Sequence, residues 1–215
     1  MRIVFISDTH LHHDRLEVPP GDILVHAGDF SGRGRLEEVK AFLDWYGSLP
    51  HTHKVLIAGN HDFLAEREPR LFRSLIPDNL IYLEDSGVTI EGIRIWGSPI
   101  QPWFFDWAFN RQRGADIRQH WALIPDDTDI LVTHGPPYGI LDRVARDGSP
   151  VGCRDLLRRI NDIDIKINVF GHIHEAYGQQ SVGNTLFLNA AVLDENYILC
   201  HKPWVVDWGG RTSRG

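Results

Sequence analysis

The chain of 215 residues is 42% hydrophobic, which suits a single domain with a buried core. Its 22 basic and 29 acidic residues give a formal net charge of −7. This charge disfavours duplex DNA as a partner, because binding to the phosphate backbone needs a basic face. A small anionic ligand stays compatible with it where metal ions supply local positive charge. We therefore expect one domain over residues 1–215 that does not bind duplex DNA.

The cysteines and the hydropathy of the chain indicate in which cellular compartment the protein is expected. Cys153 and Cys200 are far apart and form no CxxC pair, which predicts two free thiols in a reducing cytoplasm. The apolar run at residues 3–6 is too short for the core of a signal peptide. No run reaches the ~18 apolar residues that span a membrane. We expect a soluble cytoplasmic protein with no membrane partner, whose polar residues 209–215 form a frayed tail.

Short apolar runs alternate with amphipathic stretches along the chain. Five runs predict strands buried on both faces, at residues 3–7, 22–26, 54–58, 130–133 and 167–170. Apolar residues at helical spacing predict one helix over Leu36–Tyr46 and another over Cys153–Ile160, the second capped by Ser149. Residues 80–97 predict a hairpin or meander, and residues 179–206 further short strands. This order of elements indicates an α/β fold.

Polar residues that can bind metal ions follow each of the five predicted strands. In chain order they are Asp8 and His10, then Asp29, then Asn60, then His134, and finally His172 and His174. In open α/β sheets, ligands bind outside the carboxyl ends of the strands. We therefore expect these side chains to meet at one edge of the fold.

Two carboxylates, one amide and four imidazoles are too many ligands for one ion and suit two. Asp and His favour divalent ions such as Mn, Fe, Zn or Co. We expect Asp8, His10 and His174 to hold one ion, and Asn60, His134 and His172 the other. Asp29, central in the order, is the expected bridge. Two ions ~3.5–4 Å apart can share a hydroxide and hold a phosphate, so this set predicts hydrolysis of a phosphate ester.

The residue after Asn60 should point away from the ions and towards the leaving group. We therefore expect His61 to act as a general acid or to stabilise developing charge. A neighbouring carboxylate would orient it and raise its pKa. Asp62 is the nearest one in the sequence, and both residues are predicted to be catalytic.

The five blocks D-x-H, G-D, G-N-H-[D/E], H-G and G-H-x-H together resemble the motif series of calcineurin-like metallophosphoesterases. All five occur in order between Asp8 and His174. The resemblance implies a four-layer αββα sandwich that carries two divalent metal ions. It also implies metal-ligand roles for seven residues: Asp8, His10, Asp29, Asn60, His134, His172 and His174.

Longer stretches are similar to metallophosphoesterase-domain-containing proteins, which resemble class III cyclic-nucleotide phosphodiesterases. They include residues 21–30, the Thr-His-Gly-Pro-Pro run at 133–137 and the run from Phe170 to Gly178. This likeness implies hydrolysis of small phosphodiesters such as cyclic nucleotides, with Mn²⁺ expected to support activity. The sequence makes no prediction of the oligomeric state.

One departure from the motif of protein phosphatases bears on which reaction the chain is expected to catalyse. Protein serine/threonine phosphatases carry G-D-x-x-D-R-G, but the run from Gly28 to Gly34 has Gly32 in place of the second acid. This disfavours a protein phosphatase, although a phosphomonoesterase or phosphatase stays open as an alternative. A nucleotide-binding protein with a weakly active site is the alternative from another class.

Four further residues are predicted to contact the substrate. Arg33 is a candidate to hold phosphate bidentately, or is a surface arginine at a helix entry. His13 either lines the phosphate pocket or lies on an exposed loop. Trp103 belongs to an aromatic block that stacks on a nucleobase or packs on the core. Tyr177 follows the last ligand loop.

Overall fold

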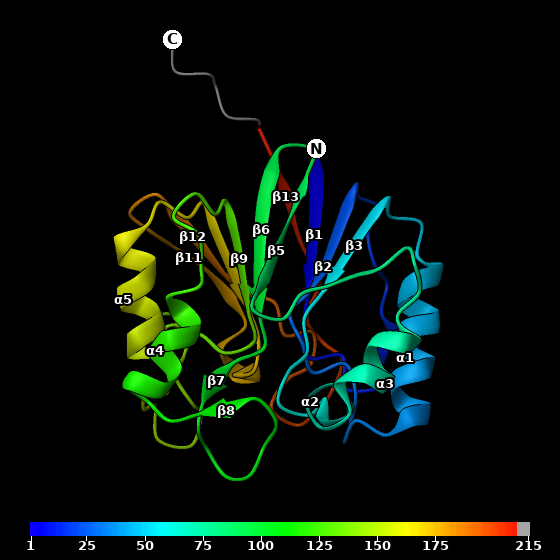
Figure 1. The fold of residues 1–215 in the computed structure, drawn as a ribbon, viewed down its shortest axis with the longest axis horizontal. Coiled ribbons are helices and arrows are strands. Elements are labelled where there is room, and N and C mark those ends of the chain that lie inside the picture. The colour runs from blue at the N-terminus through cyan, green and yellow to red at the C-terminus, as the bar shows by residue number, and fades with distance from the viewer. Residues whose placement is uncertain (210–215) are drawn as a thin grey trace.

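Two β-sheets pack face to face in the computed structural model, and helices cover the outer face of each sheet (Figure 1). The structure describes residues 1–209. The predicted frayed tail at 209–215 lies outside the described residues except for Gly209. The layers follow the order α, β, β, α, which confirms the predicted sandwich. Among residues 1–209, no helix has the length and apolar character needed to cross a bilayer.

The first sheet has the strand order β13-β1-β2-β3-β4. Its strands are β1 (Arg2–Ile6), β2 (Ile23–His26), β3 (His53–Leu56), β4 (Ile81–Tyr82) and β13 (Trp204–Asp207). Strands β1 to β4 are parallel, and β13 pairs antiparallel with β1. The register sets Phe5 beside Val25 and Val25 beside Val55. Strands β1, β2 and β3 therefore end level with one another, and the loops that follow them emerge together.

The second sheet has the order β11-β12-β10-β9-β6-β5. Its strands are β5 (Ser86–Ile90), β6 (Ile93–Ser98), β9 (Ile130–Thr133), β10 (Ile167–Phe170), β11 (Gly178–Val182) and β12 (Thr185–Asn189). A short parallel pair, β7 (Gln101–Pro102) and β8 (Asn110–Arg111), lies outside both sheets. The predicted hairpin is β5–β6, turning at Glu91 and Gly92, both of which have positive φ.

Five α-helices and two short 3₁₀ helices complete the described fold. They are η1 (His13–Arg15), α1 (Leu36–Ser48), α2 (Phe63–Arg67), α3 (Pro69–Leu75), α4 (Ala115–Trp121), α5 (Arg154–Asp162) and η2 (His174–Ala176). Helix α1 buries the predicted stripe except for Leu36, which is exposed in the first turn. Helix α5 begins later than predicted, because the Cys153 side chain and not Ser149 caps it by accepting the Leu156 N–H.

Each parallel strand of the sheet centre buries both of its faces, which explains the continuous apolar runs. On β1, Ile3 and Phe5 face the layer between the two sheets. Val4 and Ile6 face the helices and pack in a second cluster that includes Phe42 of α1. The strands are thus fixed on both sides.

We predict that Phe5→Ala will lower the free energy of unfolding by about 3–5 kcal/mol, because it opens a cavity between the sheets. Phe5 is fully buried, whereas Phe105 is 76% exposed. Phe105→Ala should change the free energy by only about 0.5 kcal/mol or less. Urea unfolding of both variants measures the difference. Equal losses would contradict this description of the core.

Candidate metal centre

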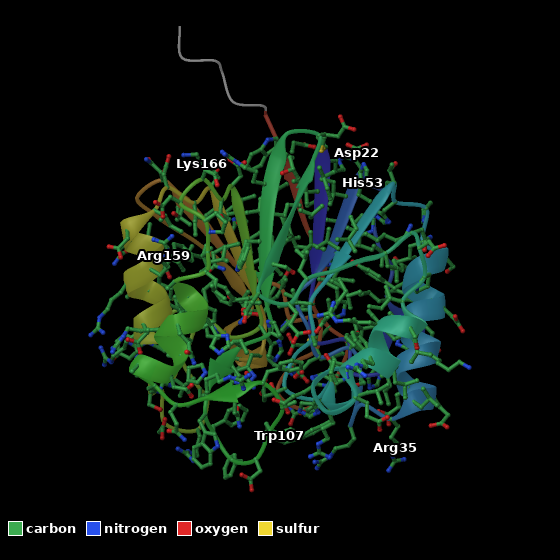
Figure 2. All side chains as sticks on the ribbon, in the orientation of Figure 1. Asp22, Arg35, His53, Trp107, Arg159 and Lys166 are labelled. Carbon is green, nitrogen blue, oxygen red and sulfur yellow. The ribbon has the colours of Figure 1, made fainter. Side chains whose placement is uncertain are left out.

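The loops that follow the strands lie at one end of the sandwich. Asp22, His53 and Lys166 mark the opposite end, where parallel strands begin, and Trp107 marks the end where they finish (Figure 2). The sequence-predicted ligands gather at the second end. Six of the seven form groups of close ligand atoms, and Asn60 contacts one of these groups through His134.

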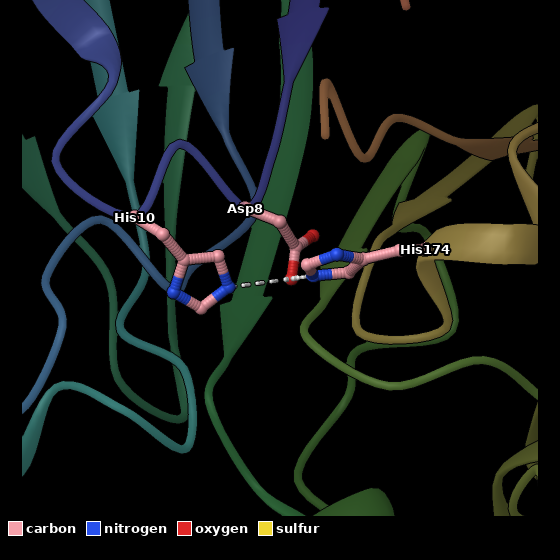
Figure 3. A group of neighbouring side chains, drawn as sticks. All are labelled: Asp8, His10 and His174. Atoms are coloured by element: carbon pink, nitrogen blue, oxygen red, sulfur yellow. Dashed lines mark hydrogen bonds and ion pairs between the residues drawn. The ribbon is translucent and has the colours of Figure 1, made fainter. Parts of the chain in front are cut away.

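Asp8, His10 and His174 form the first group, with ligand atoms within 4.8 Å of one another. The Asp8 carboxylate lies between the two imidazoles (Figure 3). Its Oδ1 is 3.3 Å from His174 Nε2 and 3.8 Å from His10 Nε2. All three side chains are buried, although they come from loops after β1 and β10.

Asp29, His134 and His172 form the second group under the same 4.8 Å limit. Asp29 Oδ2 is 3.3 Å from His134 Nε2. Asn60 Oδ1 is 2.9 Å from the same nitrogen, so the amide oxygen faces this group as predicted.

Asp29 joins the two groups. Its Oδ2 is also 3.6 Å from His10 Nε2, on the side of the first group. Its Oδ1 accepts the His61 backbone N–H at 2.8 Å, which fixes the carboxylate plane. One oxygen therefore faces both groups, which is the arrangement expected of a shared ligand.

The chemistry of the donors fits divalent ions. His10 Nε2 is buried without a hydrogen-bond partner among the described residues, and an unpaired buried nitrogen is costly unless something binds it. Burial lowers the pKa of His10 to about 4 and that of His172 to about 3, so both imidazoles are neutral ligands. Burial also opposes charge on His134 and His174. The Asp29 and Asp8 carboxylates outweigh it and raise the pKa of each to about 9. The protons on these two histidines therefore occupy positions where a metal cation is electrostatically favoured.

Backbone carbonyls orient three of the imidazoles. His134 Nδ1 lies 2.9 Å from the Ala27 carbonyl oxygen, and His174 Nδ1 lies 2.9 Å from that of Asp194. His10 Nδ1 lies 3.2 Å from the Ser31 carbonyl oxygen. A carbonyl only accepts, so each Nδ1 carries a proton and donates it. Each Nε2 is then the atom that faces the centre, as is usual for metal-binding histidines.

The glycines of the motifs leave room for ligands from other motifs. A Cβ on Gly171 would lie 1.8 Å from Asp8 Oδ2, and one on Gly59 would lie 2.3 Å from Asp29 Oδ1. Four ligands also have positive φ: Asp8 at 55°, His10 at 35°, Asp29 at 58° and His172 at 68°. A backbone conformation with positive φ costs of order 1–3 kcal/mol at a non-glycine residue, and such conformations are concentrated at functional sites. The ligand loops are therefore strained and closely packed.

His61 lies beside the centre with its ring held from two sides. Its Nδ1 is 2.7 Å from the Gly32 carbonyl oxygen, so the ring donates there. The ring stacks on Trp107 at 4.3 Å between centroids, and the Arg33 guanidinium lies 4.9 Å from the centroid of the Trp107 ring. A His61 ring nitrogen is within 4.8 Å of ligand atoms of Asp29 and His10.

The prediction that Asp62 orients His61 does not match the structure, in which the Gly32 carbonyl takes that place. The buried Asp62 carboxylate instead accepts N–H groups of Asp29, Ser31 and Gly59 at 2.7 to 3.0 Å and the Ser31 hydroxyl at 2.6 Å. The short turn after Asn60 reverses the chain direction, so the Asp62 carboxylate faces the backbone of Asp29 and Ser31. Asp62 thus ties two ligand loops together.

The four predicted substrate contacts are placed differently. Trp103 is half-exposed and lines a cavity of about 420 Å³ with Phe104 and His172. Arg33 is exposed near Trp107.

The other two lie outside the cluster. His13 is buried against Phe42 and Trp45 of the helical layer and not in the phosphate pocket. The Tyr177 ring stacks on His201 at 4.1 Å, and its hydroxyl donates to the Lys202 carbonyl.

Sequence reasoning missed two residues near the centre. His26 ends β2 and carries no sequence motif, and it is fully buried. Its Nδ1 accepts the Gly28 N–H, and its Nε2 contacts the Thr9 hydroxyl at 3.1 Å, so it braces two ligand loops. Its place at a strand end beside Gly28 was the available signal. Tyr197 has ring contacts with His10 and His174, and no sequence motif marks it.

Adjoining Asp and His clusters at the strand ends of an αββα sandwich are the arrangement expected of a metallophosphoesterase. The chain belongs to the calcineurin-like phosphoesterase family, whose model matches residues 1–176. Metallophosphoesterase domain-containing protein 1 of Homo sapiens is 42% identical over 96% of this chain and 70% of its own length. A UPF0046 protein of Caenorhabditis elegans is 36% identical over 95% of this chain and 74% of its own.

A solved structure agrees on the fold. The protein TT1561 of Thermus thermophilus superposes with a TM-score of 0.57 over 87% of this chain and 88% of that one, at 13% sequence identity. At this identity the likeness concerns the fold alone. Membership of this dinuclear, metal-dependent family places the chain in the class of phosphoester hydrolases, and its clustered Asp and His side chains could hold metal ions.

We predict that Gly171→Ala will reduce bound metal from two equivalents to one or fewer, because the new Cβ displaces the Asp8 carboxylate. Gly47→Ala in α1 is the matched control, since its Cβ meets neighbours only at 3.6 Å and beyond. Elemental analysis after dialysis against Mn²⁺ measures the stoichiometry. Full metal content in Gly171→Ala would contradict the packing argument.

Proposed function

We propose that the chain is a dinuclear metal-dependent phosphodiesterase that hydrolyses small phosphodiesters, cyclic nucleotides among them, with Mn²⁺ as a supporting metal. The observation that carries this proposal is the shared position of Asp29 Oδ2, 3.3 Å from His134 Nε2 and 3.6 Å from His10 Nε2. A single oxygen between two ligand groups is what a two-ion phosphoesterase needs.

The residues present would hold two ions. Asp8, His10 and His174 would hold one, Asn60, His134 and His172 the other, and Asp29 would contact both. When bound, such ions neutralise phosphate charge and lower the pKa of an attacking water. The chain itself supplies the buried surroundings, which strengthen these electrostatic effects.

His61 is proposed to help the leaving oxygen depart. Its Nδ1 donates to the Gly32 carbonyl, and its ring stacks on Trp107. Its Nε2 is then the atom available to a substrate held beside Asp29 and His10. Proton donation by a positioned histidine contributes ~10²–10⁴-fold to a rate.

A diester needs room for an organic group on each side of phosphorus. The cavity of about 420 Å³ beside His172 offers that room, with Trp103 and Phe104 as aromatic walls and Arg113 as a cation. Phe104 also touches the His172 ring, at 5.0 Å between centroids. These features support a small diester with a flat apolar substituent.

Free cysteines at Cys153 and Cys200 support a reducing compartment such as the cytoplasm.

The test compares a diester with a monoester. The protein is stripped with chelator, reloaded with Mn²⁺ and assayed on bis(p-nitrophenyl) phosphate, p-nitrophenyl phosphate and cyclic nucleotides. We expect metal-dependent cleavage with a higher kcat/KM for the diester. A higher kcat/KM for the monoester would favour the phosphomonoesterase alternative. Nucleotide binding without turnover of any of these substrates would favour a binding protein.

We predict that Asp29→Ala will lower kcat/KM by at least about 10³-fold, because it removes the ligand common to both groups. Asp147→Ala removes an exposed carboxylate that, within residues 1–209, bonds only with its neighbours Arg146 and Ser149, and it should leave turnover unchanged. Assays of folded variants, checked by circular dichroism, measure this. Near-normal turnover by Asp29→Ala would contradict the bridging role.

We predict that His61→Asn will slow cleavage of an alkyl ester by ~10²-fold but cleavage of a p-nitrophenyl ester much less. A p-nitrophenolate leaves without a proton, whereas an alkoxide needs one. His53→Asn, at the far end of the sheet (Figure 2), is the matched control. Comparison of kcat for the two esters gives the answer. Equal slowing of both esters would instead indicate that His61 acts as a metal ligand.

A further inference from the structure

Tyr197 reaches the centre from a tight turn after β12. The Asp194 carboxylate accepts the N–H groups of Asn196 and Ile198 at 2.9 and 2.8 Å. The Tyr197 N–H donates to the Asp194 carbonyl at 2.9 Å, and Tyr197 itself has a φ of 60°. A left-handed backbone is unfavourable for a bulky aromatic residue. The turn therefore holds Tyr197 in a position that local preference opposes.

The same turn is tied to a predicted metal ligand. The Asp194 carbonyl that accepts the Tyr197 N–H also accepts from His174 Nδ1 at 2.9 Å. The Tyr197 ring meets the His174 ring at 5.2 Å and the His10 ring at 4.9 Å, both near edge-on. Tyr197 thus has a fixed position over the first ligand group.

The hydroxyl of Tyr197 is available to a ligand. The residue is 46% exposed, and within residues 1–209 no protein group hydrogen-bonds to its hydroxyl. The hydroxyl of Tyr177, by contrast, is committed to the Lys202 carbonyl. Its ring contacts with His10 and His174 place this side chain beside the ligand cluster.

Arg33 supplies a second donor near the same opening. Its guanidinium stacks on Trp107 and, in the described part of the chain, forms no ion pair with a carboxylate. Trp107 stacks on His61, and the His61 ring meets the same His10 ring that Tyr197 contacts, at 4.6 Å between centroids. Two donors without protein acceptors beside a cation-binding centre are suited to an anion.

We propose that Tyr197 is a substrate-contacting residue whose hydroxyl donates a hydrogen bond to an oxygen of the bound phosphoryl group, with Arg33 as the second donor. This inference rests on the proposed phosphoester hydrolysis and adds to it a residue outside every motif. A tetrahedral phosphate held by two cations still has oxygen lone pairs that face outward. Tyr197 and Arg33 are both exposed, and they are the donors that such an oxygen would meet.

The experiment measures binding of inorganic phosphate to the Mn²⁺-loaded protein by calorimetry, which needs no turnover. Tyr197→Phe keeps the ring contacts with His10 and His174 and removes only the hydroxyl. We expect phosphate to bind about 10-fold more weakly, the usual size for a lost hydrogen bond to a charged group. Tyr82 lies on the edge strand β4, and its hydroxyl donates to Glu84. Tyr82→Phe removes this hydroxyl and should leave phosphate binding unchanged.

The Mn²⁺ content of each variant separates contact from packing. Equal Mn²⁺ content with weaker phosphate binding supports the proposal. Unchanged phosphate binding in Tyr197→Phe overturns it, and so does a loss of Mn²⁺ that accounts for the weaker binding. If the wild type binds no phosphate, the proposal is also wrong. If the wild type binds phosphate with the expected Tyr197 dependence but cleaves no ester, the proposed function fails and this contact stands.

Discussion

The carboxylate of Asp29 is the constraint on which the rest of the site depends. One oxygen is fixed by the His61 N–H, which leaves the other between His10 and His134. Burying carboxylates and imidazoles together is costly unless opposite charges compensate. The arrangement is therefore understandable as a frame for cations. Both sheets contribute to this frame, because His10 follows a strand of the first sheet and His134 a strand of the second.

Close packing around this carboxylate explains features that are otherwise unrelated. Gly59 lies where any Cβ would collide with Asp29 Oδ1, and Gly28 faces the His134 ring in the same way. Asp62 directs both carboxylate oxygens to the ligand loops, including the Asp29 N–H. The bond from the Asp29 N–H to Asp62 supports the positive φ of Asp29, and the Asp8 N–H, also at a residue of positive φ, donates to the Gly28 carbonyl at 2.9 Å. Rigidity built in this way keeps ligands in position before any ion binds, which favours catalysis by preorganisation.

The strand pattern predicted an α/β fold and the gathering of the ligands, because parallel strands end at a common edge. The four αββα layers were implied by the resemblance to calcineurin-like metallophosphoesterases. Residues without a strand-end motif were not predictable in this way. Asp62 was assigned to His61 by adjacency, but a turn reverses its direction. His13 was a candidate for the phosphate pocket or for an exposed loop, but in η1 it packs against the helical layer. Tyr197 depends on a left-handed turn that its own residue type disfavours.

The most direct test of the shared carboxylate is anomalous diffraction from a crystal of the Mn²⁺-loaded protein. The account predicts two manganese peaks ~3.5–4 Å apart, one beside Asp8 and His174 and one beside His134 and His172, with Asp29 contacting both. A single fully occupied peak would contradict the account. Two peaks of which only one lies within coordinating distance of Asp29 would contradict it equally.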